Sequence, residues 1–497
     1  MRTAVAIAWP ILFVGLLAMA ALASLGLLDT LPITAAYIPF GLFAVFRWLM
    51  WLGRKIPAAL YVPYPGRWET TTSVISPVYQ EDPTIFRSAL ESWRRERPTE
   101  IILVIDVTDT ACIEVARSFP DVRTIVTQKP GKRAALADGI KAASSQIVIL
   151  VDSDTIWEPG LREAVLAPFR DPGIGGVGTR QNVYRPRSLW QRIADSYLDV
   201  RYSDEAPGQT RMGRAVSCLS GRTAAYRRAV LIPLLADFLN ERFLGQVCMS
   251  GDDKRLTELV LRAGYETYFQ STARVYSMFA VDQRTALRQR LRWARNSFRS
   301  DLRAFWDGWI WKKPYLAVML IDRLLSPYAL LVGLGYFIGA VLSAHWTIAA
   351  IIGLWWLLSR TVKVIPHLLR RRRDVVILPA FIAATFIIAL LKIWALVTVH
   401  HQKWLTRAVE VRDGEVVRVD VGAPAARRLP WANRLLGTGV ALGMFSTVQL
   451  LLLSFGGAGY LAGVSIWIVV VVVSVFATVI FLRGGANALL VSRRGAD

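Results

Sequence analysis

Two carboxylates stand one residue apart at the end of an apolar segment. Asp152 and Asp154 flank Ser153 and directly follow the run from Ile147 to Val151. Oxygen ligands whose backbone is fixed by a strand can hold a divalent cation against a diphosphate. A strand end followed by an ordinary polar turn has the same appearance, so the pair indicates a metal site only together with other motifs.

A second acidic pair lies about a hundred residues further on, in Gly251-Asp252-Asp253-Lys254. A carboxylate placed beside a hydroxyl can accept its proton while that oxygen attacks an electrophilic carbon. The alternative interpretation is a helix N-terminus with acidic residues in its first turn.

Two basic motifs accompany the carboxylates. Gly131-Lys132-Arg133 begins a predicted helix, where a helix N-terminus and two cations favour phosphate. Gln289, Arg292 and Trp293 fall within about one helical turn, so their side chains can converge. An aromatic face suits a sugar ring and a guanidinium suits a leaving phosphate. The alternatives are an ordinary basic helix start and a membrane-surface helix with snorkelling arginines.

Alternating apolar segments must position these residues. Short buried strands are predicted over 71–77, 100–105 and 146–151, with helices over 86–95 and 133–143 between them. Such alternation indicates a parallel α/β sheet, in which ligands bind at the carboxyl ends of the strands.

The composition indicates a membrane protein. Of the 497 residues 54% are hydrophobic, and the net charge is +22. The basic residues lie beside apolar segments, as the positive-inside rule and an anionic leaflet require, and not among aromatics as on RNA-binding surfaces. We therefore expect no nucleic-acid partner. Three irregularly spaced cysteines (Cys112, Cys218 and Cys248) form neither a disulfide framework nor a zinc site, which fits the cytoplasm.

Six apolar runs have the length of a membrane helix: 4–28, 31–52, 320–343, 346–366, 435–455 and 461–482. A seventh, 375–399, has basic residues on both sides, and both flanks therefore favour the cytoplasm. We interpret it as interfacial or re-entrant, with an ordinary seventh span as the alternative. The segment 285–306 mixes Arg with Leu, Trp and Phe at helical spacing, which predicts an amphipathic helix on the membrane surface.

From about Thr71 to Trp293 the four motifs together resemble processive family-2 glycosyltransferases. The resemblance implies that Tyr79 and Glu81, in Pro77-Val78-Tyr79-Gln80-Glu81, lie at the base and ribose of UDP. It also implies the following roles: uracil binding for Asp106; nucleotide-sugar binding for Lys132, Arg133, Asp152, Gln289 and Arg292; a Mg²⁺ or Mn²⁺ ligand for Asp154; and the catalytic base with its acidic neighbour for Asp253 and Asp252.

Within that family the chain is most similar to hyaluronan synthases, and chitin-oligosaccharide and cellulose synthases share much of the pattern. Ser217-Cys218-Leu219-Ser220-Gly221 resembles an acceptor-pocket motif, which implies acceptor binding by Cys218, Ser220, Gly221 and Trp293. Trp404-Leu405-Thr406-Arg407 resembles a gating loop, which implies nucleotide contacts from Trp404, Thr406 and Arg407. Arg222 and Thr223 stand where those synthases have Pro and Leu.

The implied architecture is an α/β GT-A-like glycosyltransferase domain, with a parallel-rich sheet and flanking helices, fused to an all-α transmembrane region. The expected order is two N-terminal transmembrane helices (1–56), a cytoplasmic catalytic domain (57–284), amphipathic interfacial helices (285–319), a transmembrane pair (320–368), an interfacial segment with the gating loop (369–434), and a C-terminal transmembrane pair with a short basic tail (435–497).

The implied function is processive, inverting transfer from a UDP-sugar to a growing β-linked polysaccharide that crosses the cell membrane, in contact with membrane lipids. One alternative is a non-processive transferase acting on a lipid or lipid-linked acceptor. Another is a transporter without chemistry, which would need ionisable residues inside spans that are almost bare of them. The sequence leaves the sugar, the product length and any partner subunit open.

The loop from Trp404 to Arg407 is predicted to be cytoplasmic and to close over bound UDP, because it offers an aromatic face, a hydroxyl and a guanidinium. Trp404→Ala or Arg407→Ala should lower kcat strongly without unfolding the protein. In a Thr406→Cys variant the thiol should react only with cytoplasmic reagents, and more slowly with UDP and metal bound. Labelling from the outer side would contradict both the topology and the lid.

Overall fold

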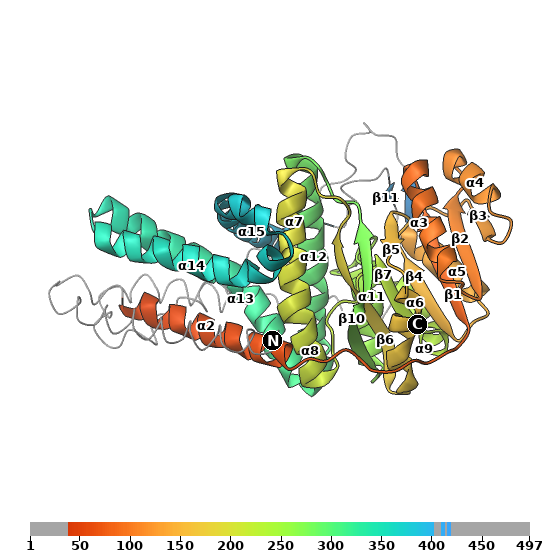
Figure 1. Cartoon of the computed structure of the whole chain (residues 1–497), viewed down its shortest axis with the longest axis horizontal. Coiled ribbons are helices and arrows are strands. Elements are labelled where there is room, and N and C mark those ends of the chain that lie inside the picture. The colour runs from red at the N-terminus through yellow and green to blue at the C-terminus, as the bar shows by residue number, and fades with distance from the viewer. Residues whose placement is uncertain (1–37, 402–408, 413–414, 419–497) are drawn as a thin grey trace.

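The protein is described here by a computed structural model, which covers residues 38–401, 409–412 and 415–418. In this part of the chain an α/β domain lies beside a set of long helices (Figure 1). The predicted spans at 4–28, 435–455 and 461–482, and the loop with Trp404, Thr406 and Arg407, lie outside the described residues.

The α/β domain is built on an eight-stranded sheet in the order β3-β2-β1-β4-β7-β6-β10-β5. Its strands are β1 (Thr72–Val78), β2 (Glu100–Asp106), β3 (Arg123–Thr127), β4 (Ile147–Val151), β5 (Thr155–Trp157), β6 (Ile174–Val183), β7 (Thr223–Arg227) and β10 (Glu266–Ser277). Two small hairpins, β8–β9 (Arg242–Phe243, Gln246–Val247) and β11–β12 (Val409–Arg412, Glu415–Arg418), lie apart from it.

The sheet is parallel in its first half and mixed in its second. Strand β1 pairs in parallel with β2 and β4, and β2 pairs in parallel with β3. Strand β7 lies antiparallel between β4 and β6, whereas β6 and β10 are parallel. The three strands predicted from sequence form within one residue of their expected bounds. The prediction of a parallel-rich sheet is confirmed, but the antiparallel β7, a short run around two alanines, gave no signal of its own.

Helices cover both faces of the sheet. One face packs against α3 (Pro83–Arg95), α4 (Thr110–Arg117) and α6 (Leu161–Leu166). The other packs against α5 (Lys132–Ala142), α7 (Leu189–Val200), α9 (Arg228–Leu231), α10 (Leu235–Leu239) and α11 (Asp252–Arg262). A Cβ at Gly139 would lie 2.4 Å from the Ile75 side chain, so this glycine lets α5 approach β1 closely. The result is one buried sheet whose carboxyl edge stays open.

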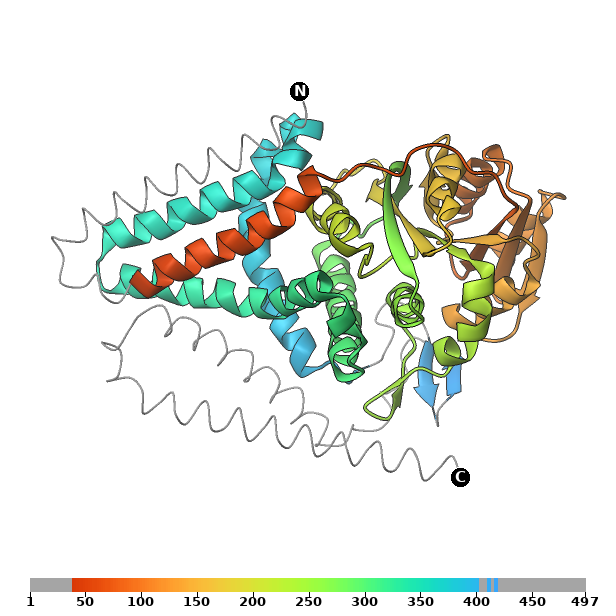
Figure 2. The same ribbon diagram turned by 90° about the horizontal axis from the view of Figure 1, so that it is seen from below.

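Within residues 38–401, three helices are long and apolar enough to cross a membrane: α13 (Pro314–Leu342), α14 (Trp346–Arg370) and the helical stretch Arg372–Val397, which contains α15 (Leu378–Val397). The first two correspond to the predicted runs 320–343 and 346–366. Helix α2 (Ile38–Ala59), from the predicted run 31–52, lies alongside α13 and α14 (Figure 2).

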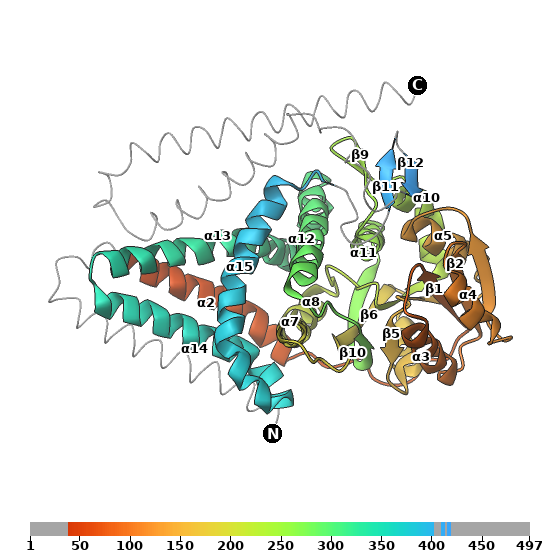
Figure 3. The same ribbon diagram turned by 90° about the horizontal axis from the view of Figure 1, so that it is seen from above.

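Helices α7, α12 (Gln283–Trp306) and α15 run across the direction of α2, α13 and α14. Figures 1 and 3 show these three helices, hereafter the transverse layer, between the long helices and the sheet. Phe298 of α12, Leu324 and Tyr328 of α13, and Leu396 of α15 share one buried cluster. This orientation of α15 agrees with the interfacial interpretation of 375–399, which stays a prediction.

The π-helical turn Arg201–Glu205 and α8 (Ala206–Gly213) continue α7 towards α2. Lys55 of α2 donates to Asp204 at 2.6 Å, and Arg323 of α13 pairs with Asp301 of α12 at 3.2 Å. Ion pairs thus join the long helices to the transverse layer and to the α/β domain.

A buried ionic network fixes α7 to the end of α14. The Asp199 carboxylate accepts hydrogen bonds from Arg180 (3.1 Å), Asn182 (3.1 Å), His367 (2.8 Å) and Arg370 (2.6 Å). Burial alone would raise the pKa of Asp199, but the hydrogen bond from His367 and the charge of Arg370 outweigh it and lower that pKa to about 2. The carboxylate is therefore ionised and tied to both helices.

Asp199→Asn should destabilise the protein by about 3 kcal/mol, because it removes the fully buried carboxylate that Arg180, His367 and Arg370 share. The measurement is the Tm of the detergent-purified chain. The matched control is Glu114→Gln, which removes one side of an exposed pair with Arg117 and should leave Tm almost unchanged. Equal Tm values for the two variants would show that the network contributes nothing beyond a surface ion pair.

Candidate active site

The carboxyl edge of the sheet opens into a cavity of about 420 Å³. Strands β1, β2 and β4 end at this edge, and the residues that follow or finish them supply Tyr79, Glu81, Asp106, Asp152 and Asp154 to its wall. The N-termini of α5 and α11, the loop before β7, and α12 supply Lys132, Ser220, Gly221, Asp252, Asp253, Gln289, Arg292 and Trp293. The sequence placed these residues in one site, and the structure brings them together.

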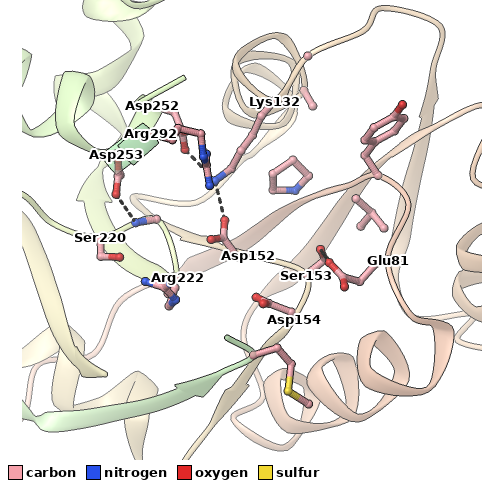
Figure 4. Close-up of a pocket in the computed structure, with 18 of the residues that line it drawn as sticks. Glu81, Lys132, Asp152, Ser153, Asp154, Ser220, Arg222, Asp252, Asp253 and Arg292 are labelled. Carbon is pink, nitrogen blue, oxygen red and sulfur yellow. Dashed lines mark hydrogen bonds and ion pairs between the residues drawn. The ribbon is translucent and has the colours of Figure 1, made fainter. Parts of the chain in front are cut away.

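Lys132 joins the two acidic motifs. Its ammonium lies 2.6 Å from an Asp152 oxygen and 2.8 Å from an Asp252 oxygen (Figure 4). Burial disfavours the charge on Lys132, but the two carboxylates outweigh burial and raise its pKa. The same pairing lowers the pKa of Asp252 against the effect of its own burial. Gly131, at φ 108°, provides the turn that starts α5 with Lys132 facing the cavity.

The second Asp of the DxD motif lies in a different electrostatic environment. Burial, then the negative charges of Asp152 and Glu81, raise the pKa of Asp154 to about 7. Ser153 donates to Glu81 at 2.8 Å, which holds that carboxylate beside the motif. Clustered carboxylate oxygens with a raised pKa are what a divalent cation would neutralise, so Asp154 and its neighbours fit a Mg²⁺ or Mn²⁺ ion.

Asp253 lies on the opposite side of the cavity, in the first turn of α11. One carboxylate oxygen accepts hydrogen bonds from the Gly221 backbone (3.3 Å) and the Cys218 thiol (3.7 Å), and the other accepts from the Lys254 backbone (2.8 Å). Gly251 starts this helix at φ 80°, and a Cβ there would lie 3.0 Å from Asn296 and Arg299. The carboxylate is thus oriented by neutral donors and faces the cavity.

An aromatic wall closes the cavity on the side of α12. Trp293 lies edge-to-face with Phe279, their ring centroids 6.0 Å apart. The guanidinium of Arg222 lies 4.3 Å from the Phe279 ring centroid and 5.2 Å from that of Trp293. Such a surface can stack against a sugar ring.

Two predicted residues lie away from the cavity. Arg133 is buried and donates to the Phe238 and Ser250 carbonyls at 3.0 Å and to the Glu241 carboxylate. Successive residues of a helix point about 100° apart, so Lys132 and Arg133 cannot face the same space. Cys218 contributes only through its contact with Asp253. The prediction that Arg133 binds the nucleotide therefore has no support from its position.

Several residues that line the cavity were not predicted from the sequence. Arg222 and Phe279 are the most prominent, and Lys129 and Asn296 line it too. The sequence offered an indication of Arg222, because this residue directly follows Gly221 at a position where hyaluronan synthases have Pro. It offered none of Phe279: this residue follows the long β10, and only the fold brings it beside Trp293.

Another acidic cluster is not a metal site. Asp195, Asp199 and His367 bring one ligand atom each within 4.8 Å of one another. The Arg370 guanidinium already pairs with both carboxylates, so they are neutralised within the protein.

Known proteins resemble this chain in sequence and fold. A family model described as "Glycosyltransferase like family 2" matches residues 70–296. An N-acetylglucosaminyltransferase of Rhizobium meliloti is 30% identical over 412 residues, which cover 77% of this chain and 92% of that protein. A type 2 glycosyltransferase of Pyricularia oryzae is 26% identical over 382 residues, covering 69% and 76%.

Among solved structures, a mannosyltransferase from Pyrobaculum calidifontis in complex with GDP-Man and Mn²⁺ is similar, with 22% identity and a TM-score of 0.49. The match covers 73% of this chain and 99% of that one. With a mixed sheet between two helical layers, the catalytic domain has the GT-A-like fold predicted from sequence. The chain belongs to glycosyltransferase family 2 and is an enzyme that uses a nucleotide-sugar.

Proposed function

We propose that the enzyme transfers N-acetylglucosamine from UDP-N-acetylglucosamine, repeatedly and with inversion, to the end of a β-linked glycan. The observation that carries the proposal is the division of the cavity. Asp154 lies just after β4 and Asp253 lies in the first turn of α11, while Lys132 lies between the two acidic motifs, paired with Asp152 and Asp252. The relative from Rhizobium meliloti, named an N-acetylglucosaminyltransferase, supports the choice of sugar.

On the donor side, Asp154 would hold Mg²⁺ or Mn²⁺, with Asp152 and Glu81 close by. When bound, the ion supplies positive charge against the diphosphate that leaves with UDP. Tyr79, Asp106 and Lys132 would bind the nucleotide, and Arg292 adds a second cation for the leaving phosphate. Lys132 is already held by Asp152 and Asp252, so its charge is in place before the donor binds.

On the acceptor side, Asp253 would take the proton from the attacking hydroxyl. The hydroxyl oxygen forms a bond to the anomeric carbon while the bond from that carbon to the UDP oxygen breaks, which inverts the anomeric centre. Asp253 accepts only neutral donors from the backbone and a thiol, so no cation competes for its lone pairs in the described part of the chain.

The processive character is supported by the aromatic wall and the transverse layer. Trp293 and Phe279 offer a stacking surface for the glycan terminus, and α12 carries this wall directly onto α13 and α15. A growing glycan would therefore leave the site towards the long helices of the cell membrane, with the catalytic domain on the cytoplasmic side.

The second candidate is a non-processive transferase with a lipid or lipid-linked acceptor. The observation that favours it is the position of the site beside helices able to cross a membrane. Hyaluronan synthesis is a variant of the first proposal in which the enzyme needs two different donor sugars. Assays with single UDP-sugars and with pairs of UDP-sugars distinguish it from synthesis with one donor.

Asp154→Ala should weaken UDP binding in the presence of Mn²⁺ by about tenfold or more, because the ion would lose its link between carboxylate and diphosphate. Isothermal titration with and without Mn²⁺ measures this. Arg133→Gln, away from the cavity, is a control for general disturbance and should retain Mn²⁺-dependent binding if folded. Unchanged UDP affinity in Asp154→Ala would remove the metal assignment.

Purified enzyme given UDP-N-acetylglucosamine and Mn²⁺ should release UDP and make a ladder of β-linked oligomers, sized by mass spectrometry. Asp253→Asn should lose at least about a thousandfold in kcat while its affinity for UDP stays near wild type, since the base acts only in the chemical step. A product with a single added sugar would favour the lipid-acceptor candidate. Turnover that requires two different donors would favour a hyaluronan-like polymer. Full activity of Asp253→Asn would refute the base.

A further inference from the structure

A second cavity, of about 90 Å³, lies between α2, α13 and α14. Figure 2 shows these three helices side by side, away from the sheet. The cavity shares no lining residue with the active site. Its volume is several times the roughly 10–15 Å³ that one water molecule needs, so it admits a polar group of several atoms.

Positive charge gathers at this cavity. Arg47, Arg360 and Lys363 line it, and no Asp or Glu is among its lining residues. Arg47 is neutralised by Asp322, which also accepts from Arg54 at 2.9 Å. Within residues 38–401, 409–412 and 415–418, neither Arg360 nor Lys363 has a carboxylate within ion-pair distance.

The remaining apolar runs of the chain cannot supply the missing negative charge. The segments 4–28, 435–455 and 461–482 contain no Asp and no Glu. Two cations between apolar helices without a carboxylate are costly in a membrane unless an anion or water meets them. Neither the described residues nor these three runs therefore supply the counter-charge of Arg360 and Lys363.

The cavity also offers a neutral donor. The indole nitrogen of Trp51 is buried and has no hydrogen-bond partner among the described residues. Trp51 is 4% exposed and lies edge-to-face with Trp48, 4.6 Å between ring centroids. The Lys363 ammonium lies 5.9 Å from the centroid of the Trp48 ring. Two unneutralised cations and an unpaired N–H around one space form a site for an anion with several acceptor oxygens.

We propose that this cavity binds the phosphate of an anionic phospholipid from the surrounding membrane. Lys363 and Arg360 lie seven and ten residues before the end of α14 at Arg370, about 10–15 Å along the helix. Their long side chains can therefore contact a lipid headgroup that lies near the Arg370 end of α14. Leu354 and Leu357 of α14 are 56% and 45% exposed, which provides an apolar surface for the acyl chains.

A lipid fits better than a free phosphate because α13 and α14 are long and apolar enough to lie within a membrane. The bound lipid would hold α2 against α14 through charges that otherwise repel each other, since Arg47, Arg360 and Lys363 line the same space. The proposal is independent of the sugar that the active site transfers.

The test is native mass spectrometry of the full chain in detergent, titrated with phosphatidylglycerol or with phosphatidylcholine of the same acyl chains. Wild type should bind one phosphatidylglycerol at least about tenfold more tightly than phosphatidylcholine. Arg360→Gln/Lys363→Gln should lose that preference, because each cation contributes a charge-assisted hydrogen bond. The matched control is Arg372→Gln/Arg373→Gln, which removes the same charge from exposed positions outside the cavity and should keep the preference.

Three outcomes would overturn the proposal. One is an equal loss in the control pair, which would mean general attraction of basic residues to headgroups. Another is displacement of the lipid by millimolar inorganic phosphate, which would mean a site for free anions. The third is a wild type without preference between the lipids. If the double variant does not fold, Trp51→Phe decides: it keeps the ring and loses the N–H, and affinity for phosphatidylglycerol should fall several-fold. Unchanged affinity in that variant would count against the site.

Discussion

The active site depends on the pairing of one buried ammonium with two carboxylates from distant parts of the chain. Asp152 ends a parallel strand and Asp252 begins a helix a hundred residues later, and Lys132 lies between them. Without this cation, the carboxylates of the two motifs would repel each other across a poorly solvated space. With it, the end of β4 and the start of α11 are linked across the cavity by ion pairs.

This pairing also explains why neighbouring carboxylates have different properties. Asp252 is stabilised as an anion by Lys132, whereas Asp154 lies beside the negative charges of Asp152 and Glu81, which Arg222 offsets only in part. Burial raises the pKa of both residues, and the charges beside Asp252 reverse that effect whereas those beside Asp154 add to it. The protein thus leaves one carboxylate group only partly compensated at the place where a divalent cation would add positive charge.

The sequence was sufficient where a local pattern carries the information. Strands β1, β2 and β4 are uninterrupted apolar runs, and the carboxylates at their ends had to meet at one edge of the sheet. Local patterns were insufficient where a tertiary contact determines whether a side chain lies in the site. Arg133 is a basic residue next to Lys132 in sequence, but its side chain is buried and pairs with the Glu241 carboxylate. Phe279 becomes part of the site only because β10 pairs with β6.

Helix α12 connects the long helices to the candidate active site, because it packs against α13 and α15 and also lines the cavity. This helix carries Gln289, Arg292 and Trp293 into the cavity, and one turn later Asn296 accepts a hydrogen bond from Ser250 at 2.8 Å. Ser250 directly precedes Gly251, which starts the helix that bears Asp253. At the same level Arg295 donates to Thr398, at the end of α15, at 2.9 Å.

Helix α12 contacts α15 on one side and the loop before α11 on the other, so a movement of α12 is transmitted to both. A shift of α15 that displaced α12 would carry the aromatic wall and the loop before Asp253 together, and so would preserve their relative position. Gln191 of α7 donates to the Phe279 carbonyl at 3.0 Å, so the second helix of the transverse layer holds the same wall from the other side. The aromatic wall is therefore built on the transverse layer, whereas Asp152 and Asp154 follow a strand of the sheet.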